Sequence, residues 1–197
     1  RGGWGAVVVV GDSVAELGGR EAHTTNNRME LVGAIRALEN ALMMIKSDAK
    51  TSVGASSGAL ASVYTDSRYV INGITKWIFS WKKRGWKTLQ KDDVINRDLW
   101  EELDSLVENL RDKNVKIKWN YVGGHIGIVG NERVDEIASL YAEAGAKSTP
   151  KLFSGSLDDY KYDIKNISLD EKQVAQKKDK SDAKSRSRAK AYSYVSM

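Results

Sequence analysis

The fold is indicated first by the stretch VYTDSRYV at residues 63–70. Its first half is a short β-branched and aromatic strand that ends at the carboxylate of Asp66, and a short helix follows from about Arg68. Further along, residues 97–111 repeat leucine at helical spacing, and residues 115–121 alternate apolar with polar side chains as a half-buried strand does. Strands that alternate with helices predict an α/β domain.

The residues before this stretch continue the pattern. Residues 6–10 are an apolar, β-branched run that predicts a buried strand, and a turn leads to an antiparallel strand near residues 15–23. Residues 26–46 carry apolar side chains at helical spacing beside a second stripe of small residues, which suits close packing of a helix on a sheet. A last helix is expected over residues 131–146.

Composition excludes several classes of protein. The chain has 197 residues, no cysteine and one proline, so disulfide scaffolds and zinc–thiolate sites are excluded. No apolar run reaches the roughly 18 residues that a membrane span needs, and no secretory signal opens the sequence. We therefore expect a cytoplasmic protein that does not bind a membrane.

The periodic pattern predicts three regions. A domain is expected over residues 1–148, interrupted at residues 47–62 by a flexible insertion rich in Ser, Ala and Gly. Residues 149–190, which follow the pattern's end near Pro150, predict a charged, disordered linker. Residues 191–197 turn strand-like and suggest the start of a further, truncated module.

Three carboxylates fall where the predicted fold brings chain segments together. Glu30 lies in the first turn of one helix, Asp66 ends a strand, and Asp135 lies in the first turn of the last helix. Sites in open α/β sheets form beyond the strand ends and near helix N-termini. Converging carboxylates there suit Mg²⁺, although a single carboxylate at such a position is more often a cap or a surface charge.

Positive charge is concentrated in one part of the predicted domain. The net charge is +5, yet residues 1–150 carry 20 Lys and Arg against 19 Asp and Glu. Residues 76–91, called here the basic segment, hold six of these cations, three tryptophans and no acid. Such a block favours a polyanion such as nucleic acid, with a solvated helix face as the plain alternative.

Five motifs in a fixed order carry a family resemblance. They are TTNNRMEL at residues 24–31, YTDSRYV at 64–70, GITKWI at 73–78, WKKRGWK at 81–87, and GHIG at 124–127 with NERVDE at 131–136. In this order they closely resemble bacterial ribonuclease HI, the type 1 ribonuclease H family, over roughly residues 2–146. The resemblance implies a ribonuclease H-like α/β fold, with a mixed five-stranded sheet flanked by helices.

The resemblance also implies an activity, which is endonucleolytic hydrolysis of the RNA strand of RNA–DNA hybrids by a mechanism that uses two Mg²⁺ ions, with Mn²⁺ as a substitute. By motif position, Glu30, Asp66 and Asp135 correspond to metal ligands. His125 would assist proton movement or product release, and a plain surface histidine is its alternative. The implied catalytic residues are thus Glu30, Asp66, His125 and Asp135.

Substrate contacts follow from the same motifs. Thr25, Asn26 and Asn27 would lie against the hybrid, where amide groups suit a 2′-OH or a minor-groove edge. The basic segment resembles the protrusion by which bacterial members hold the DNA backbone, and its expected contacts are Trp77, Trp81, Lys82, Lys83, Arg84 and Lys87. Trp77 and Trp81 could instead anchor the protrusion as apolar side chains. The implied partner is a hybrid duplex bound by a monomer.

The sequence departs from the family at its start. Family members open with a central strand that bears a fourth carboxylate, and no such strand precedes the GGWG motif of residues 2–5 here. Asp12 is no substitute, because it lies in the turn after the next strand. We expect the central strand to be missing, two interior sheet edges to be unpaired, and the sequence to be a fragment truncated at both ends.

Two further functions stay open on the sequence alone. A chain that has lost one carboxylate could be a non-catalytic domain that binds RNA–DNA hybrids or RNA. A structural domain that joins a larger assembly through the Lys- and Arg-rich residues 177–190 is the third possibility.

Overall fold

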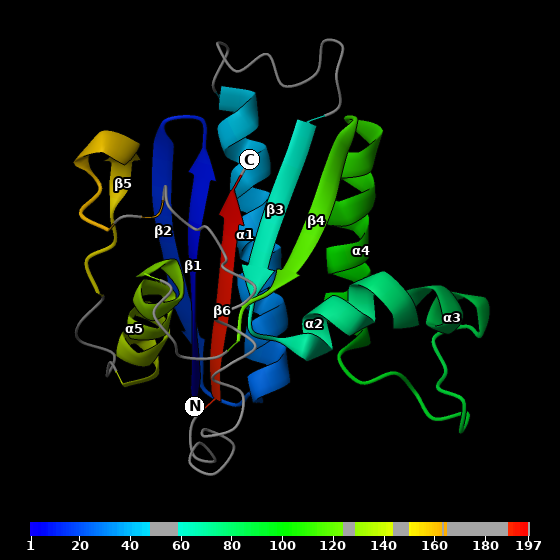
Figure 1. Cartoon of the computed structure of the whole chain (residues 1–197). Helices are drawn as coiled ribbons and strands as arrows, with labels where there is room; N and C mark the ends of the chain where they lie inside the picture. The colour runs from blue at the N-terminus through cyan, green and yellow to red at the C-terminus, as the bar shows by residue number, and fades with distance from the viewer. Residues whose placement is uncertain (48–58, 124–128, 144–149, 163, 165–188, 197) are drawn as a thin grey trace.

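A mixed sheet with strand order β4-β3-β6-β1-β2-β5 forms the middle of the molecule (Figure 1). The computed structural model describes residues 1–47, 59–123, 129–143, 150–162, 164 and 189–196. The strands are β1 (Gly2–Val10), β2 (Ser13–Glu21), β3 (Ala59–Thr65), β4 (Val115–Tyr121), β5 (Ser154–Ser156) and β6 (Ala189–Ser196). The ribonuclease H-like α/β arrangement expected from the sequence is confirmed.

Strand β1 is apolar along its length because helices cover both of its faces. Ala6, Val8 and Val10 point to the core shared with α1 (Asn26–Ser47) and α4 (Arg97–Asp112). Val7 and Val9 belong to a second core with α5 (Val129–Glu143), which lies on the opposite face (Figure 1). A strand buried on both faces reads as a continuous hydrophobic run.

The small-residue stripe predicted on the first helix is buried. Ala34, Ala37 and Ala41 of α1 have no exposed surface. Small side chains let α1 approach the sheet closely, and its backbone contacts β1 and β6. This packing fixes the position of the N-terminal part of α1, whose second turn carries Glu30.

One continuous helical segment follows β3 and extends away from the sheet (Figure 1). It comprises α2 (Arg68–Asn72), a π-helical turn η1 (Gly73–Trp77) and α3 (Ile78–Lys83). Its middle rests on Trp100 of α4, which is fully buried. A Cβ atom at Gly73 would lie 1.9 Å from the Trp100 ring, so only glycine allows this contact.

The centre of the sheet differs from the sequence prediction. Two unpaired interior edges were expected on β1 and β3, but β6 lies between them. It runs parallel to β1, from Gly2 opposite Ala189 to Val9 opposite Ser196, and antiparallel to β3. Over the described residues the sheet therefore has six strands where five were predicted, and residues 189–196 belong to the same sheet as β1 rather than to a further module.

The residues just after Pro150 also differ from the prediction. They were assigned to a disordered linker, yet β5 pairs antiparallel with β2 and a 3₁₀ turn, η2 (Leu157–Asp159), follows it. Tyr160 and Ile164 are buried in the second core. Residues 149, 163 and 165–188 of the predicted linker lie outside the described residues, and its last two residues, 189 and 190, begin β6.

The predicted insertion at residues 47–62 overlaps β3, because this strand begins at Ala59 instead of Val63. Residues 48–58 of the insertion lie outside the described part of the chain. Among the helices that the structure describes, none is both long and apolar enough to cross a membrane.

Candidate active site

Three elements bring the predicted carboxylates together at one end of the sheet. Asp66 follows β3 directly, whereas Glu30 and Asp135 lie in the second turns of α1 and α5, one turn later than the sequence predicts. Burial, followed by the negative charges of Glu30 and Asp135, raises the pKa of Asp66 to about 7. Because the charges of both other carboxylates act on Asp66, the three form one electrostatic unit, called here the carboxylate site.

Ser67 holds Glu30 in place within this site. The buried Ser67 hydroxyl donates a hydrogen bond to Glu30 Oε2 and accepts one from the Val70 N–H at 3.1 Å, which caps α2. Its own N–H donates to Thr65 Oγ1 at 3.1 Å. Burial raises the pKa of Glu30, and the hydrogen bond from Ser67 opposes this shift.

The donor chemistry of the carboxylate site fits a hard cation. Its side chains offer only carboxylate oxygens, and their mutual repulsion would be relieved by positive charge. Within the described ranges, no three Asp, Glu or His side chains are already grouped as a metal cluster. The hydrogen bond from Ser67 occupies one oxygen of Glu30, Oε2, and a carboxylate has a second oxygen that can ligate an ion.

The sequence drew attention to two other titratable residues, His125 and Asp12. His125 lies outside the described residues, so its predicted role stays a prediction. Asp12 lies in the exposed turn between β1 and β2, as the sequence indicated.

The predicted hybrid contacts at the start of α1 are exposed and adjacent to Glu30. Thr25 caps the helix, since its Oγ1 accepts a hydrogen bond from the Arg28 N–H at 3.3 Å. Asn26 and Asn27 are exposed and precede Glu30 by four and three residues. Residues at these spacings are neighbours on a helix surface, so the two amides and the carboxylate share one face.

Trp77 and Trp81 serve the fold to different degrees. The Trp81 ring lies 5.4 Å from the Trp100 ring and packs against the main core. Trp77 lies 5.8 Å from Trp81 and keeps 39% of its surface exposed. The interpretation of these residues as an apolar anchor is therefore confirmed for Trp81, while Trp77 can also contact a ligand.

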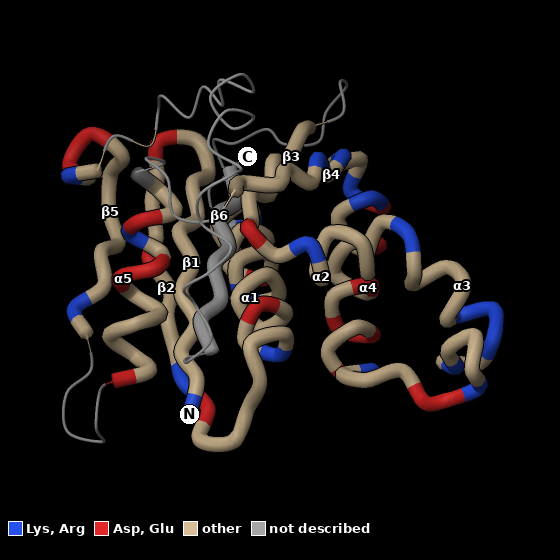
Figure 2. Tube along the Cα trace, turned by 60° about the horizontal axis from the view of Figure 1, so that its bottom comes forward, with Lys and Arg blue, Asp and Glu red and all other residues tan. Residues whose placement is uncertain are grey.

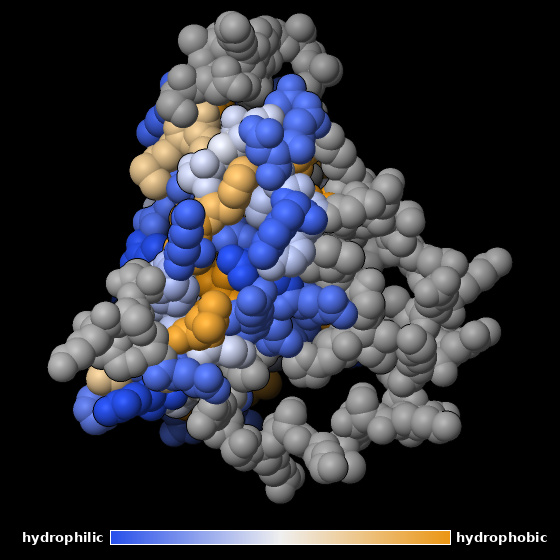
Figure 3. All heavy atoms as spheres, turned by 90° about the vertical axis from the view of Figure 1, so that its left-hand side faces the viewer, coloured by the Kyte–Doolittle hydropathy of each residue, from blue (hydrophilic) through white to orange (hydrophobic). Residues whose placement is uncertain are grey.

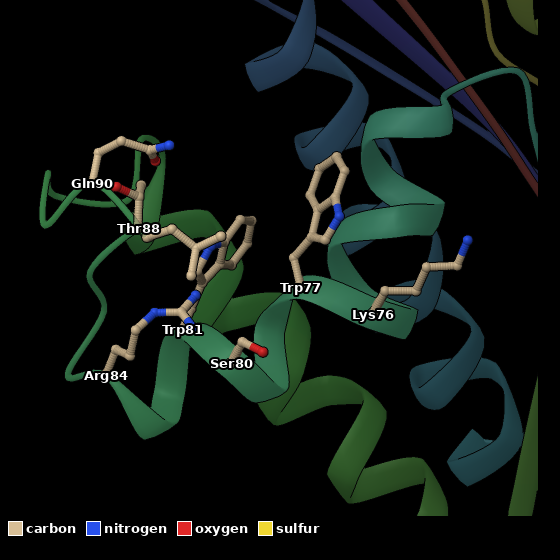
Figure 4. Close-up of a pocket in the computed structure, with 8 residues that line it drawn as sticks. Lys76, Trp77, Ser80, Trp81, Arg84, Thr88 and Gln90 are labelled. Atoms are coloured by element: carbon tan, nitrogen blue, oxygen red, sulfur yellow. The ribbon is translucent and has the colours of Figure 1, made fainter.

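A pocket of about 360 Å³ lies beside these rings. It is formed between the helical segment that carries Trp77 and Trp81 and the loop that carries Thr88 and Gln90 (Figure 4). Its lining comprises Lys76, Trp77, Ser80, Trp81, Arg84, Thr88, Leu89 and Gln90. Cations, hydroxyls and an indole face in one pocket suit a phosphate with its neighbouring sugar or base.

The predicted cations of the basic segment are not equivalent, although they cluster along α3 (Figure 2). Lys82 Nζ is paired with Asp104 at 2.6 Å and Glu108 at 3.3 Å on α4. Lys87 is paired with Asp93 at 2.6 Å. Lys83 and Arg84 are exposed and have no ion pair within the described part of the chain, which leaves their charges available to a polyanion.

Comparison with known proteins now identifies the family, because a family model described as RNase H matches residues 1–143. The chain belongs to the ribonuclease H family.

Three relatives show the extent of this similarity. A Ribonuclease H from Thermosynechococcus vestitus is 49% identical over 138 residues, which cover 70% of this chain and 76% of the relative. A Ribonuclease H from Pseudomonas savastanoi is 47% identical over 138 residues, or 70% and 80% of the two chains. A Ribonuclease H from Cupriavidus pinatubonensis is 47% identical over 139 residues, or 71% and 83%.

The match places both candidate surfaces within the ribonuclease H domain. Residues 1–143 include the carboxylate site, the exposed amides of α1 and the basic segment. Sequence reasoning missed Ser67 as a site residue, although its place directly after Asp66 was a usable signal. It also missed Thr88 and Gln90, which reach the pocket only because the loop after α3 folds back on the helix.

Proposed function

We propose that this ribonuclease H-family chain hydrolyses the RNA strand of RNA–DNA hybrids with the help of two divalent cations, Mg²⁺ or Mn²⁺. Family membership supports the reaction, since the similar proteins are named Ribonuclease H or HI. The electrostatics of the carboxylate site support the cofactor. The exposed amides and the basic segment support the substrate.

The raised pKa of Asp66 is the observation that carries this proposal. A carboxyl with a pKa near 7 is poorly stabilised as an anion by the protein alone. Burial and two neighbouring negative charges cause this, so the site gains stability when a cation binds. Buried carboxylates that repel one another at the end of a sheet strand suit metal-assisted phosphoryl chemistry.

Glu30, Asp66 and Asp135 would hold the cations. When bound, two cations would activate water and stabilise the attacking and leaving oxygens of an in-line displacement at phosphorus. Ser67 positions Glu30, and α5 positions Asp135. His125 is proposed to assist proton movement or product release.

Substrate recognition would combine two surfaces. Asn26 and Asn27, one helical turn from Glu30, would contact the strand being cut, where a 2′-OH distinguishes RNA from DNA. Residues 68–77 span roughly 15 Å at about 1.5 Å per residue, so the pocket around Trp77 would hold the duplex backbone away from the cut. Contacts of this second kind position a duplex without reading its sequence.

The test is cleavage of an end-labelled RNA–DNA hybrid with and without Mg²⁺, comparing the unchanged chain with Asp66→Asn and Asp12→Asn. We expect Asp66→Asn to lower kcat by roughly 10³-fold or more, because an essential ligand loses its charge. Asp12→Asn also removes one carboxylate, but from an exposed turn, and should retain full activity.

Binding measured on the same hybrid separates the alternative function. Mg²⁺-dependent cleavage that Asp66→Asn abolishes supports the enzyme. Tight hybrid binding without cleavage by the unchanged chain would instead identify a non-catalytic hybrid-binding domain and overturn the proposal.

A further inference from the structure

A buried ion pair joins β2 to the helix that carries Asp135. Arg133 of α5 donates from Nε to Glu16 Oε1 at 2.6 Å and from Nη2 to Glu16 Oε2 at 2.7 Å. The Glu16 and Arg133 side chains are only 1% and 9% exposed. An Arg–carboxylate pair with two parallel hydrogen bonds is among the stronger ion pairs. When such a pair is buried, it is favourable only if the other lone pairs of the carboxylate also accept hydrogen bonds.

The remaining positions on Glu16 are filled from beyond residue 150. The Phe153 N–H donates to Glu16 Oε2 at 2.9 Å, and the buried Tyr160 hydroxyl donates to Glu16 Oε1 at 2.8 Å. Burial alone would raise the pKa of Glu16, but hydrogen bonds from Arg133, Phe153 and Tyr160 bring it below its ordinary value. Glu16 is therefore an ionised hub whose four hydrogen bonds come from α5 and from residues 150–162.

Residues 150–162, called here the clamp segment, lie outside the family match, which ends at residue 143. They are nonetheless fixed to the domain. The Glu16 N–H donates to the Phe153 carbonyl at 2.8 Å, and β5 pairs with β2. The apolar residues of the clamp segment face the second core, and Figure 3 shows this side of the molecule with only a narrow hydrophobic strip between hydrophilic residues.

The contact between α5 and the sheet fixes the distance of the helix from the sheet. A Cβ atom at Gly3 would lie 2.1 Å from the Ala138 carbonyl oxygen, and one at Gly5 would lie 2.6 Å from that of Val134. The helix thus rests at closest approach on β1, and its distance from the sheet is set by glycine. Sliding along the sheet and rotation about the helix axis must be restrained by side chains.

Arg133 supplies this restraint next to Asp135. Successive residues of a helix point about 100° apart. The buried Val134 faces the sheet, so Arg133 and Asp135 point to opposite flanks of α5. Arg133 is held by Glu16 on its flank, while the charge of Asp135 acts on Asp66 from the other. Together with the apolar packing of Val134, Ile137 and Ala138 on the sheet, the hold of Glu16 on Arg133 therefore restrains the angle at which Asp135 enters the carboxylate site.

We infer that the clamp segment is a positioning element of the active site: Tyr160 and the Phe153 N–H lock Glu16, Glu16 locks Arg133, and Arg133 sets the place of Asp135. This inference rests on the proposed function and adds the residues that act through Asp135 without touching the metal or the substrate.

The test uses Glu16→Gln and Tyr160→Phe in the full chain. Both substitutions conserve side-chain shape and remove a charge or a hydroxyl. We expect Mg²⁺ binding, measured by calorimetry without substrate, to weaken about 10-fold in Glu16→Gln and less in Tyr160→Phe. In hybrid cleavage, kcat should fall in the same order while KM stays within twofold of the unchanged chain, since the substrate-binding surfaces are untouched.

Ser156→Ala is the matched control. Ser156 belongs to the clamp segment and caps η2 at an exposed position, without contacting Glu16. Thermal unfolding of each variant sets an assay temperature at which all are folded. Unchanged Mg²⁺ affinity in Glu16→Gln and Tyr160→Phe, or an equal loss in Ser156→Ala, would overturn the inference.

The two readouts keep the inference separate from the proposed function. If the unchanged chain binds Mg²⁺ but cuts no hybrid, the proposed function fails and the Mg²⁺ affinities alone decide the inference. If the unchanged chain binds no Mg²⁺, both are overturned.

Discussion

The carboxylate site and the basic segment hold their charges in opposite ways. Asp66 is mostly buried among like charges that come from α1 and α5, elements far apart in the sequence. The basic segment holds exposed cations within one continuous stretch, and two of them are neutralised by acids of α4 or of the following loop. The carboxylate site brings like charges together, so its residues repel one another. The basic segment spreads its cations over the surface and pairs two of them with acids, so little repulsion remains.

This difference separates chemistry from attachment. A site of mutually repelling carboxylates is useful only when a cation completes it, so the fold must hold it against its own electrostatics. A surface of exposed cations needs little from the fold beyond a platform, which Trp100 and Trp81 provide. Three experiments below test whether the two regions are this distinct, in order of decreasing expected effect.

Trp100→Ala should mainly lower the stability of the protein, whereas Trp77→Ala should mainly weaken hybrid binding. Trp100 is fully buried and donates from Nε1 to the Tyr69 hydroxyl at 3.2 Å, so its loss should cost about 3–5 kcal/mol in unfolding free energy. Trp77 is partly exposed, and its loss should cost about 1 kcal/mol while raising KM for the hybrid. Urea unfolding and steady-state cleavage measure both quantities. A larger stability loss for Trp77→Ala would contradict the assignment.

The metal-free protein should lose stability as pH rises from about 4 to 7. The folded-state pKa of Asp66 is raised to about 7, so the folded protein binds a proton there that the unfolded chain has released above its ordinary value of 3.8. This stabilising contribution is present below pH 4 and is lost as pH passes 7. Mg²⁺ should then raise Tm more at pH 8 than at pH 5, because cation and proton compete for the same carboxylates.

Thermal unfolding in chelator and in Mg²⁺ checks this prediction, with Asp66→Asn as the control. The control should show a flatter pH dependence and a smaller rise in Tm with Mg²⁺. Identical profiles for the two proteins would show that Asp66 does not titrate in this range.

Single lysine substitutions in the basic segment should have the smallest effects. Lys83→Ala removes an exposed charge without an ion pair in the described structure, and should flatten the salt dependence of hybrid binding by about one phosphate contact. Lys82→Ala removes a charge already shared with Asp104 and Glu108, and should flatten it less. Removing Lys82, Lys83 and Arg84 together should raise KM clearly. An unchanged salt slope in this triple variant would exclude the basic segment as a substrate contact.

Local periodicity was sufficient to predict most elements of the domain. The helices at 26–47 and 97–112 and the strand at 115–121 agree with the sequence prediction to within a residue. The start of β3 was missed, because Ala59 to Ser62 lie in a Ser- and Ala-rich stretch without alternation. Pairing with β4 makes these residues a strand, and that pairing is not visible in a local pattern.

Long-range contacts account for what the sequence could not predict. The place of β6 depends on pairing with β1 across 187 residues and with β3 across 130 to 134 residues, which no local pattern encodes. Residues 150–164 read as polar and charged, yet Tyr160 is buried because its hydroxyl meets Glu16, 144 positions earlier. At the site, the motifs indicated Glu30, Asp66 and Asp135, but the raised pKa of Asp66 follows only from their convergence in space.

Because of the π-helical turn between α2 and α3, the number of residues in this segment decides which way the side chains of α3 point. A π-helical turn is equivalent to one inserted residue in an α-helix. Removing one residue from 73–77 would let the turn revert to α-helix, and every residue after it would rotate by about 100°. Trp81 would then leave Trp100, and the pocket would lose one wall. Substitutions at the exposed positions of this segment leave the rotation of α3 about its axis unchanged, whereas deletion of a single codon would change it for the whole of α3.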